Sequence, residues 1–467
     1  AYARERGIRV VPEFDIPGHS TSWLVGHPEL GSAPGPYTIE RRPGIFEPAL
    51  DPTREEVYKF LETFLGEMAA LFPDAYLHIG GDENEGKQWD RNPKIQAYMK
   101  EKGIKDNHAL QAYFNQRLLK ILQKHGKRMI GWDEILQPGL PKDVVIHSWR
   151  GTAALAEAAK KGYDGILSNG YYIDLIYPAS QHYIADPLPA DSPLTQEEAK
   201  HVLGGEATMW GEWVTPETID SRIWPRTAAI AERLWSPRTV ADVDDMYRRL
   251  AVISLQLEEL GLTHRRNSDM MLRRLMRSEN IGPLRTLVSI IEPVKEYRRY
   301  QMRPQTMLSP LTGIVDATTP DSEAGRRFAW MVKELLGDAP RFQLYRDDIS
   351  RALANWQTAS NELEPIIARS PALKEVTPLA RNVSDIGETG LEAIAFLKLG
   401  GVPTNEWRDA SLAKLDEAAK PYGALEFVVI PSVRQLVIAA TELPRLKSMT
   451  AAEWNKQVTT LASPSKK

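Results

Sequence analysis

Short apolar runs alternate with helical patterns over the first half of this chain, and this alternation limits the folds open to it. The runs are rich in branched and aromatic residues and lack the alternation of a half-exposed strand; they cover residues 8–14, 75–79, 128–131, 144–149, 164–168 and 206–210. Strands covered on both faces of a parallel sheet have this composition. Helical patterns lie between them, at 54–71, 107–125 and 153–161. Repeated strand–helix units predict a parallel α/β fold.

The ends of these runs separate two parallel architectures. Most runs end in a polar and aromatic cluster, as in PEFDIPGH, HIGGDE, GWDE, HSWR and MWGE. A (β/α)8 barrel takes functional side chains from the C-terminal ends of several strands, whereas a doubly wound sheet concentrates them at one switch point, usually with a glycine-rich phosphate loop. No such loop sequence follows any of the runs. The sequence therefore predicts a TIM-type barrel, with about six of its eight strand–helix units present.

The second half of the chain has a different pattern. Amphipathic helical stretches follow one another there, at 327–336, 349–367, 379–398, 406–419 and 433–443. We therefore expect two domains: an N-terminally incomplete barrel over residues 1–280 and an all-α domain over residues 281–467. No pattern in the second region indicates chemistry, and its apolar stripes read as core and domain interface.

Composition excludes several classes of function. The 467 residues include 58 basic and 62 acidic ones, so the net charge of −4 gives no electrostatic reason to bind nucleic acid or an anionic membrane. No cysteine is present, which excludes disulfides, thiolate metal sites and a cysteine nucleophile. No apolar run is long enough to insert into a membrane. The nine histidines show no metal-ligand spacing, so we expect no metal site.

The adjacent carboxylates Asp82 and Glu83 carry the strongest chemical signal. They follow a buried run through two glycines, in the sequence HIGGDE. Two ionised acids held close together at a strand end repel each other, which raises the pKa of one of them and keeps it protonated. Glycoside cleavage needs a protonated acid at the departing oxygen. An Asp-Glu pair at a helix N-terminus, stabilised by the helix dipole, is the competing interpretation. The surrounding residues favour the first.

Aromatic residues stand at the ends of several other runs. Trp132, Trp149 and Trp210 would face the mouth of one barrel and form an aromatic box. Aromatic faces suit the apolar face of a sugar or a methyl group. Tyr172 and Asp174 lie two residues apart, on one side of an extended chain, and both can hydrogen-bond a polyhydroxylated ligand.

These motifs together resemble glycoside hydrolase family 20, the β-N-acetylhexosaminidases. The matching stretches are PEFDIPGHS at 12–20, HIGGDE at 78–83, GWDE at 131–134, YYID at 171–174 and EATMWGEWVTPETIDSRIWPRTAAIAERLWS at 206–236. They occur in the family's order over roughly residues 1–240. The helical region lies outside the resemblance.

The resemblance implies a retaining exo-glycosidase that needs neither metal nor organic cofactor. Its substrate would be a terminal β-linked GlcNAc or GalNAc, whose own acetamido group attacks the anomeric carbon to give an oxazolinium intermediate. By position, Glu83 would be the general acid and base, and Asp82 would hold the acetamido N–H. Tyr172 would contact the acetamido oxygen, and Trp132, Trp149 and Trp210 would surround the methyl group and the sugar ring. Asp174 and Glu212 would bind hydroxyls, and His19 would stand behind the acid.

One departure from the family pattern concerns the N-terminus. The family's first two strands supply an arginine and an aspartate that have no counterpart before PEFDIPGH, and the chain begins without Met, inside what reads as a helix end. We expect a fragment of a longer active protein. A partner or swapped segment that completes the barrel is an alternative, as is a non-catalytic sugar-binding protein. A glycosidase with an enzyme nucleophile would need a second carboxylate about 5 Å from the first. We expect a periplasmic or secreted bacterial protein; the oligomeric state stays open.

Overall fold

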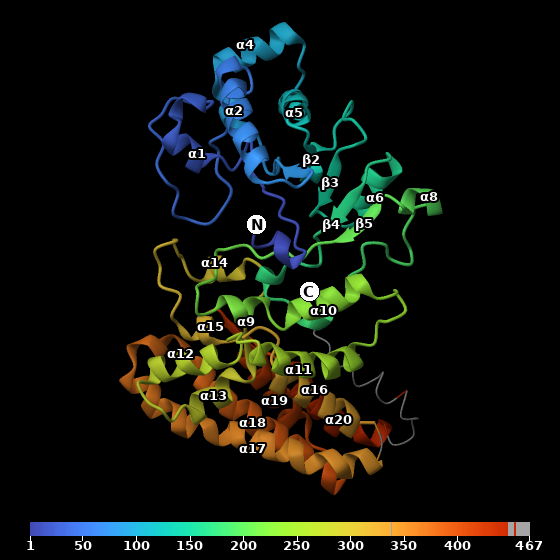
Figure 1. Ribbon diagram of the computed structural model, residues 1–467. Helices are drawn as coiled ribbons and strands as arrows, with labels where there is room; N and C mark the ends of the chain where they lie inside the picture. Colours follow the sequence, from blue (N-terminus) through green and yellow to red (C-terminus); the bar gives the residue numbers. More distant parts are fainter. Residues whose placement is uncertain (338, 447–452, 454–467) are drawn as a thin grey trace.

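The protein was analysed as a computed structural model that describes residues 1–337, 339–446 and 453. A parallel sheet with covering helices occupies the upper half of Figure 1, and a region of packed helices occupies the lower half. Helices α9 (Ile219–Ile223), α10 (Arg226–Trp235) and α14 (Arg298–Met302) lie between the two. This arrangement places the C-terminal ends of the strands near the helical region.

Five parallel strands form the sheet in their sequence order: β1 (Tyr76–His78), β2 (Arg128–Trp132), β3 (Val145–Ser148), β4 (Gly165–Leu167) and β5 (Val202–Gly205). Each connection therefore moves one strand further in the same direction. A barrel is wound in this way, whereas a doubly wound sheet reverses direction at its switch point. The predicted parallel α/β architecture is confirmed, with five strands in the ladder rather than six.

The first predicted strand, at residues 8–14, is wrong in its extent. Only its end pairs with the sheet: the Phe14 and Ile16 N–H groups donate to the carbonyls of His78 and Ile79, each at 3.0 Å. Ile8, Val10 and Val11 are 57%, 43% and 37% exposed instead of buried. Branched residues read as a strand from sequence, but a strand also needs a neighbour, and these residues lie at the open edge of the sheet.

The last predicted strand, at residues 206–210, is also misplaced. The strand there is β5, which ends at Gly205, and the ladder between β4 and β5 shifts register at Gly165 and Ile166. Residues 206–208 continue beside the chain that follows β4, where the Thr208 N–H donates to the Tyr171 carbonyl at 3.1 Å. The motif thus starts where regular strand pairing ends, at the C-terminal edge of the sheet rather than in its core.

Helices α2 (Glu55–Leu71), α5 (Asn107–Lys124) and α6 (Thr152–Lys160) cover the sheet, with α5 against β2 and α6 against β3 and β4. In α2, Val57, Leu61 and Leu65 recur every four residues and are fully buried. This spacing puts them on one face of the helix, which packs into the same hydrophobic cluster as the strand residue Leu77. The three helices predicted from sequence in this half are confirmed to within a residue at each end.

Shorter helices connect these units. They are α1 (Thr21–Gly26), α3 (Lys87–Arg91), α4 (Pro93–Lys102), α7 (Ala179–Ile184) and α8 (Gln196–Ala199), with 3-10 turns at Arg4–Arg6, Pro28–Leu30, Asp133–Ile135 and Ile173–Leu175. The last of these turns, η4, carries Asp174 and lies next to the mouth of the sheet.

The C-terminal region has its own hydrophobic cluster, which extends from Met271 to Ala440. The five helices predicted there are confirmed as parts of α16 to α20, although α16 starts four residues earlier and α17 ten residues earlier than expected. Helix α11 (Val243–Glu259) packs against α7 and α10. The helices of the C-terminal region are α12 (Arg266–Met276), α13 (Gly282–Val288), α15 (Ile314–Ala317), α16 (Glu323–Leu335), α17 (Ala339–Arg369), α18 (Thr377–Leu399), α19 (Asn405–Ala418) and α20 (Ile430–Leu446), with a 3-10 turn at Pro371–Val376.

This region is not made of helices alone, so that detail of the prediction is wrong. Strands β6 (Ile291–Pro293) and β7 (Leu425–Phe427) pair antiparallel within it. Each has only three residues, which is too short for a hydrophobic period to be visible in the sequence. Among the residues that the structure describes, no helix combines the length and apolar character needed to cross a bilayer.

A buried arginine, Arg222, joins the sheet half to the helical region, and a second, Arg226, lies against it. Arg222 and Arg226 are each 1% exposed. The Arg222 guanidinium donates to the carbonyls of Thr318, at 2.8 Å, and Asp316, at 3.0 Å, both in the helical region. Burial lowers the pKa of Arg226 to about 10, so the group keeps its charge at neutral pH. Hydrogen-bonded carbonyls compensate part of the cost of burying these charges.

Candidate active site

Asp82 and Glu83 follow β1 on a sharply turned backbone. Gly80 and Gly81 have φ angles of +68° and +93°, and Glu83 has a φ of +50°. Residues other than glycine rarely adopt positive φ angles of this kind. A Cβ atom on Gly80 would lie 1.9 Å from Oδ1 of Asp15. Only glycine therefore fits beside the neighbouring segment. Strain of this kind is concentrated at functional sites, where surrounding contacts hold it in place.

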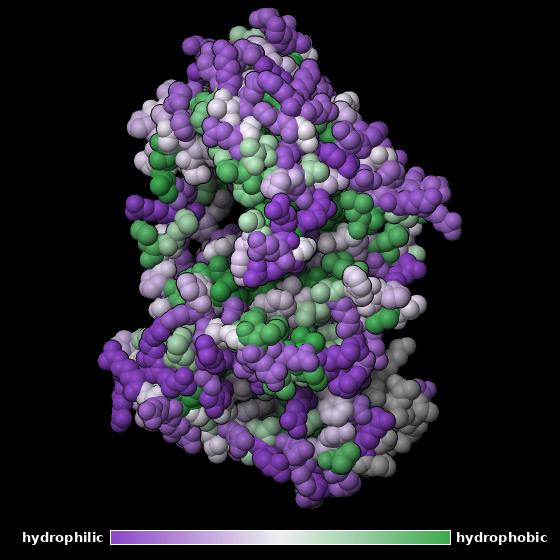
Figure 2. Space-filling view, viewed as in Figure 1, coloured by the Kyte–Doolittle hydropathy of each residue, from purple (hydrophilic) through white to green (hydrophobic). Residues whose placement is uncertain are grey.

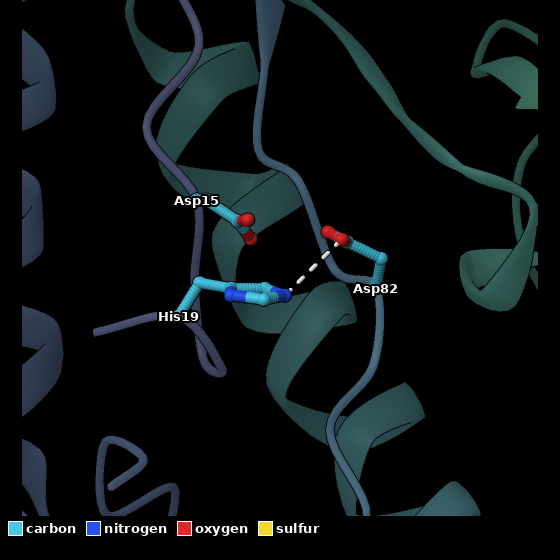
Figure 3. A group of neighbouring side chains, drawn as sticks. All are labelled: Asp15, His19 and Asp82. Atoms are coloured by element: carbon cyan, nitrogen blue, oxygen red, sulfur yellow. Dashed lines mark ion pairs between the residues drawn. The ribbon is translucent and has the colours of Figure 1, made fainter. Parts of the chain in front are cut away.

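His19 joins the two carboxylates. It comes from the segment beside β1 and points toward Asp82 (Figure 3). Its Nε2 atom lies 3.4 Å from Oδ2 of Asp82 and 3.3 Å from Oε2 of Glu83. Hydrogen bonding to Asp82 and then to Glu83 raises the pKa of His19 to about 10. The imidazole is therefore charged at neutral pH and stabilises the negative charge of the two carboxylates.

Asp15 completes this group. Potential ligand atoms of Asp15, His19 and Asp82 all lie within 4.8 Å of one another, and Figure 3 shows the three side chains converging. The carboxylate of Asp15 accepts the Gly81 N–H at 3.1 Å, while burial, followed by the charge of Asp82, raises its pKa to about 8. A carboxyl that retains its proton near neutral pH is a poor cation ligand. We interpret the group as a proton-sharing network that positions Asp82.

Three of the predicted aromatic residues lie together at the mouth of the sheet. The rings of Trp132 and Trp210 are 6.1 Å apart between centroids, and those of Trp210 and Tyr172 are 6.5 Å apart. Trp210 is 39% exposed, so part of its ring is open to a ligand. Burial raises the pKa of the Tyr172 hydroxyl, which keeps it a neutral hydrogen-bond donor. Residues from β2, from the turn after β4 and from the loop after β5 thus share one surface.

Two of the tryptophans donate their indole N–H groups to carboxylates, which fix the orientation of their rings. The Trp132 indole N–H donates to Glu13 at 2.9 Å, and the Trp149 indole N–H donates to both carboxylate oxygens of Glu134 at 3.1 Å. Among the residues that the structure describes, the ring contacts of the predicted box join Trp132, Trp210 and Tyr172 but not Trp149, which the structure fixes only through Glu134. Partial burial raises the pKa of Glu13 to about 7, although the Trp132 hydrogen bond acts against that rise.

Asp174 and Glu212 are near enough for the charge of Glu212 to affect the pKa of Asp174. Asp174 is buried in η4, and burial, with a contribution from the charge of Glu212, raises its pKa to about 7. Glu212 is exposed in the loop after β5. Buried oxygens without a hydrogen-bond partner among the described residues occur at Oδ1 of Asp174 and Oδ1 of Asp82. Unpaired buried oxygens are costly, and a hydroxyl or amide of a ligand would satisfy both.

The sequence indicated most of this site but not the residues that hold it. Glu13, Asp15 and Glu134 hold it, and their only signal in the sequence is that they stand inside the motifs PEFDIPGH and GWDE. Their specific partners could not be predicted, since Glu13 meets Trp132 across 119 positions of sequence. His78 is a buried residue whose Nδ1 accepts the Gly80 N–H at 3.0 Å.

Glu134→Gln should flatten the pH dependence of stability. Burial raises the pKa of Glu134 from 4.5 to about 7, so the folded chain binds the proton more tightly than the unfolded chain does. Stability from this group is therefore full below about pH 4.5 and is lost as the pH rises through about 7. We expect the unfolding temperature of the parent to fall between about pH 5 and pH 8, and that of the variant to fall less.

Glutamine can still accept the Trp149 indole N–H, so the variant keeps the contact while losing the titration. Thermal unfolding followed at several pH values measures the effect. Glu67→Gln, at an exposed position of α2, is the matched control. Equal slopes for the parent and Glu134→Gln would contradict the assignment.

Comparison with known proteins places these motifs in one family. A family model described as "Glycosyl hydrolase family 20, catalytic domain" matches residues 1–238. The beta-hexosaminidase subunit beta of Mus musculus is 38% identical over 274 residues, which cover 56% of this chain and 49% of that protein. The beta-hexosaminidase of Porphyromonas gingivalis is 35% identical over 281 residues, covering 56% of this chain and 36% of that protein. The chain thus spans about half, or less, of the length of these relatives.

Solved structures extend the similarity. A chitobiase from Flavobacterium johnsoniae has 41% sequence identity and a TM-score of 0.87, and the match covers 93% of this chain and 67% of that one. An exo beta-N-acetylglucosaminidase from Vibrio harveyi, solved with N-acetylglucosamine, has 31% identity and a TM-score of 0.50 over 57% of this chain and 45% of its own. The helical region, which the sequence motifs left outside the resemblance, is included in the first match.

Proposed function

The chain belongs to glycosyl hydrolase family 20, and we propose that it hydrolyses the bond to a terminal β-linked N-acetylhexosamine in an oligosaccharide or glycoconjugate. The beta-hexosaminidase relatives and the structural similarity to a chitobiase support this substrate class. The terminal sugar is GlcNAc or GalNAc, and the reaction retains the anomeric configuration.

One observation carries the proposal: two adjacent carboxylates share a charged histidine and stand next to an aromatic surface. His19 contacts both Asp82 and Glu83. Glu13 connects this group to the box, because it accepts the Trp132 indole N–H and is also close enough to Asp82 for that charge to affect its pKa. A site that only bound sugar would need the aromatic surface but no pair of acids at its edge.

In the first step the substrate itself supplies the nucleophile. Glu83 donates its proton to the glycosidic oxygen, and the acetamido carbonyl oxygen attacks the anomeric carbon as the bond to the leaving group breaks. The product is a cyclic oxazolinium ion together with the released alcohol. Asp82, whose Oδ1 has no partner in the described structure, accepts the acetamido N–H and stabilises the positive charge that develops there. Tyr172 donates to the acetamido oxygen and orients it.

In the second step the roles of acid and base reverse. The Glu83 carboxylate takes a proton from water, and that water attacks the anomeric carbon on the face that the leaving group left. The bond between the acetamido oxygen and the anomeric carbon breaks, the acetamido group is restored, and the anomeric carbon regains its original β configuration. Trp132, Trp149 and Trp210 keep the methyl group and ring in place, while Asp174 and Glu212 bind hydroxyls of the terminal sugar.

Release of 4-nitrophenol from 4-nitrophenyl β-N-acetylglucosaminide by the 467-residue chain tests this function. We expect hydrolysis of that substrate and none of 4-nitrophenyl β-glucoside, which lacks the acetamido nucleophile. Proton NMR of the first product should show the β-anomer. Equal cleavage of both substrates would point to an enzyme nucleophile instead, and sugar binding without hydrolysis would identify a non-catalytic binding protein.

A further inference from the structure

We propose that a small monovalent anion such as chloride binds in the cavity that Arg222 and Arg299 line, at the boundary between the sheet half and the helical region. Ile176 also lines this cavity and stands two residues after Asp174, so an occupied site would support the turn that carries Asp174. The tests of this inference need no substrate, and it therefore does not depend on the proposed hydrolysis.

The cavity is small, and segments far apart in the sequence form it. Its volume is about 10 Å³, which is the space that one water molecule needs. Helix α9 contributes Arg222 and the loop after β5 contributes Trp213. The chain from the end of β6 to α14 contributes Glu296 and Arg299. A chloride ion is only slightly larger than a water molecule and fits after a small movement of these side chains, whereas larger anions do not.

The charges at the cavity do not balance. Arg222 and Arg299 are 1% and 5% exposed, and the buried carboxylate of Asp316 neutralises the second of them. Its Oδ1 atom accepts from Nη2 of Arg299 at 2.7 Å, and its Oδ2 atom accepts the Gly313 N–H at 2.9 Å. The Arg222 guanidinium donates to backbone carbonyls and forms no ion pair within the described part of the chain. One buried positive charge is therefore left without a counter-ion.

Arg226 adds to this excess of positive charge. Its guanidinium contacts the carbonyl of Arg222 and is equally buried. The carboxylates whose charges act on Arg226 are either paired or partly protonated: Glu292 pairs with Lys295, Asp321 pairs with Arg326, and burial raises the pKa of Asp174 to about 7. These carboxylates therefore do not neutralise the charge of Arg222.

Hydrogen-bond donors of both arginines are unsatisfied as well. Nε of Arg222 and Nε of Arg299 are buried and have no hydrogen-bond partner among the residues that the structure describes. A water molecule accepts hydrogen bonds but leaves the positive charge uncompensated. A chloride ion accepts hydrogen bonds and also supplies negative charge, and a buried charge is far less costly when it is paired. The chemistry of the lining therefore favours an anion over water.

The surroundings of the cavity offer little else to stabilise a charge. Trp213 is 9% exposed, and the Arg299 guanidinium lies 4.0 Å from the centre of its ring. Hydrophobic residues also reach the surface across the middle of the molecule, between the sheet and the helices, in Figure 2. Glu296 is an acid in the lining, but it is exposed and its carboxylate contacts the Tyr177 hydroxyl. The counter-ion of Arg222 is therefore expected to come from solution.

Chloride should stabilise the protein in a saturable way. We expect the unfolding temperature to rise by about 2 °C, and then to level off, as chloride replaces gluconate up to about 200 mM at constant ionic strength. Gluconate is too large for the cavity, and the constant ionic strength keeps general screening unchanged. Calorimetry measures the shift. The anomalous X-ray signal of crystals in bromide gives a direct second measurement, with a peak expected beside Arg222 and Arg299.

Arg299→Gln should remove the chloride dependence. The substitution frees Asp316 to pair with Arg222, so the cavity no longer holds an unpaired positive charge. Arg298→Gln is the matched control, because Arg298 is the exposed neighbour that pairs with Glu426, and this variant should keep the dependence. Arg299→Gln is expected to start from a lower stability, but the measured quantity is the difference between chloride and gluconate in each protein.

The outcomes are distinct. A saturable shift in the parent that Arg298→Gln keeps and Arg299→Gln loses supports the anion site. Equal unfolding temperatures of the parent in chloride and in gluconate would show that water fills the cavity, whether or not Arg299→Gln folds. The same chloride dependence in Arg299→Gln as in the parent would place the anion elsewhere, and so would bromide peaks that lie only outside the cavity.

Discussion

Glu83→Gln is expected to lower the rate of hydrolysis by a factor of about 10²–10⁴, the usual contribution of a general acid and base. Glutamine keeps the size and hydrogen-bonding capacity of the side chain but can neither donate a proton to the glycosidic oxygen nor accept one from water. The effect should be largest for a disaccharide, whose leaving alcohol needs protonation, and smaller for 4-nitrophenol, which departs readily as an anion. Steady-state rates with both substrates measure this difference.

Binding provides the internal check on this variant. The aromatic surface does not depend on Glu83, so GlcNAc should still quench tryptophan fluorescence with an affinity close to that of the parent. Glu85→Gln is the matched control, because Glu85 lies two residues further along the chain and is exposed. Full activity in Glu83→Gln would refute the assignment of Glu83 as the acid, and equal losses in both variants would point to a general effect of the substitution.

Arg226→Ala is expected to destabilise the fold by at least about 3 kcal/mol, since removing a buried charged partner leaves the groups around it unpaired. The Arg226 guanidinium donates to the carbonyls of Tyr177, at 2.7 Å, and Ile173, at 2.8 Å, and also contacts the carbonyl of Arg222. Alanine would leave these three carbonyls without their donor and open a cavity at a position that is 1% exposed. The unfolding temperature should fall by several degrees, as calorimetry would show.

The same substitution should affect the site more than its distance from Glu83 suggests. Ile173 and Tyr177 flank Asp174, so the turn that carries Asp174 loses its support. We expect weaker binding of GlcNAc at temperatures where the variant is still folded. Arg248→Ala, at a side chain of α11 that is 70% exposed, is the control. An unfolding temperature within about a degree of the parent would show that Arg226 does not have this structural role.

The chemistry of the site could be predicted from sequence because its parts are local. Asp82 and Glu83 stand in one short motif, and each predicted tryptophan is recognisable where a strand or its following loop ends. Parallel strands place such ends along one edge, so their proximity follows once the strands are assigned. The structure brings Trp132, Trp210 and Tyr172 into ring contact. The catalytic and binding roles of these residues stay predictions until the variants are measured.

Strand boundaries were less predictable than strand existence. Residues 8–11 have the branched composition of a strand but no neighbour on the open edge of the sheet. Residues 206–210 were expected to be a strand because they are apolar and aromatic, yet pairing ends at Gly205. Hydrophobicity reports what a segment can bury, whereas a strand is defined by hydrogen bonds to a partner that the segment does not contain.

The sequence by itself determined the order of strand–helix units, the helices of the C-terminal region and the acids and aromatic residues of the proposed site, because each depends on a period or motif within a few consecutive residues. Only the tertiary structure decided which carboxylates accept the indole N–H groups of Trp132 and Trp149, how Arg222 joins the two halves, and that the Glu296 N–H donates to the carbonyl of Leu175, next to Asp174. The Glu296–Leu175 contact shows the reason: its two residues are 121 positions apart, and neither has a local pattern that specifies the other. Such contacts follow from how whole elements pack, which no local pattern encodes.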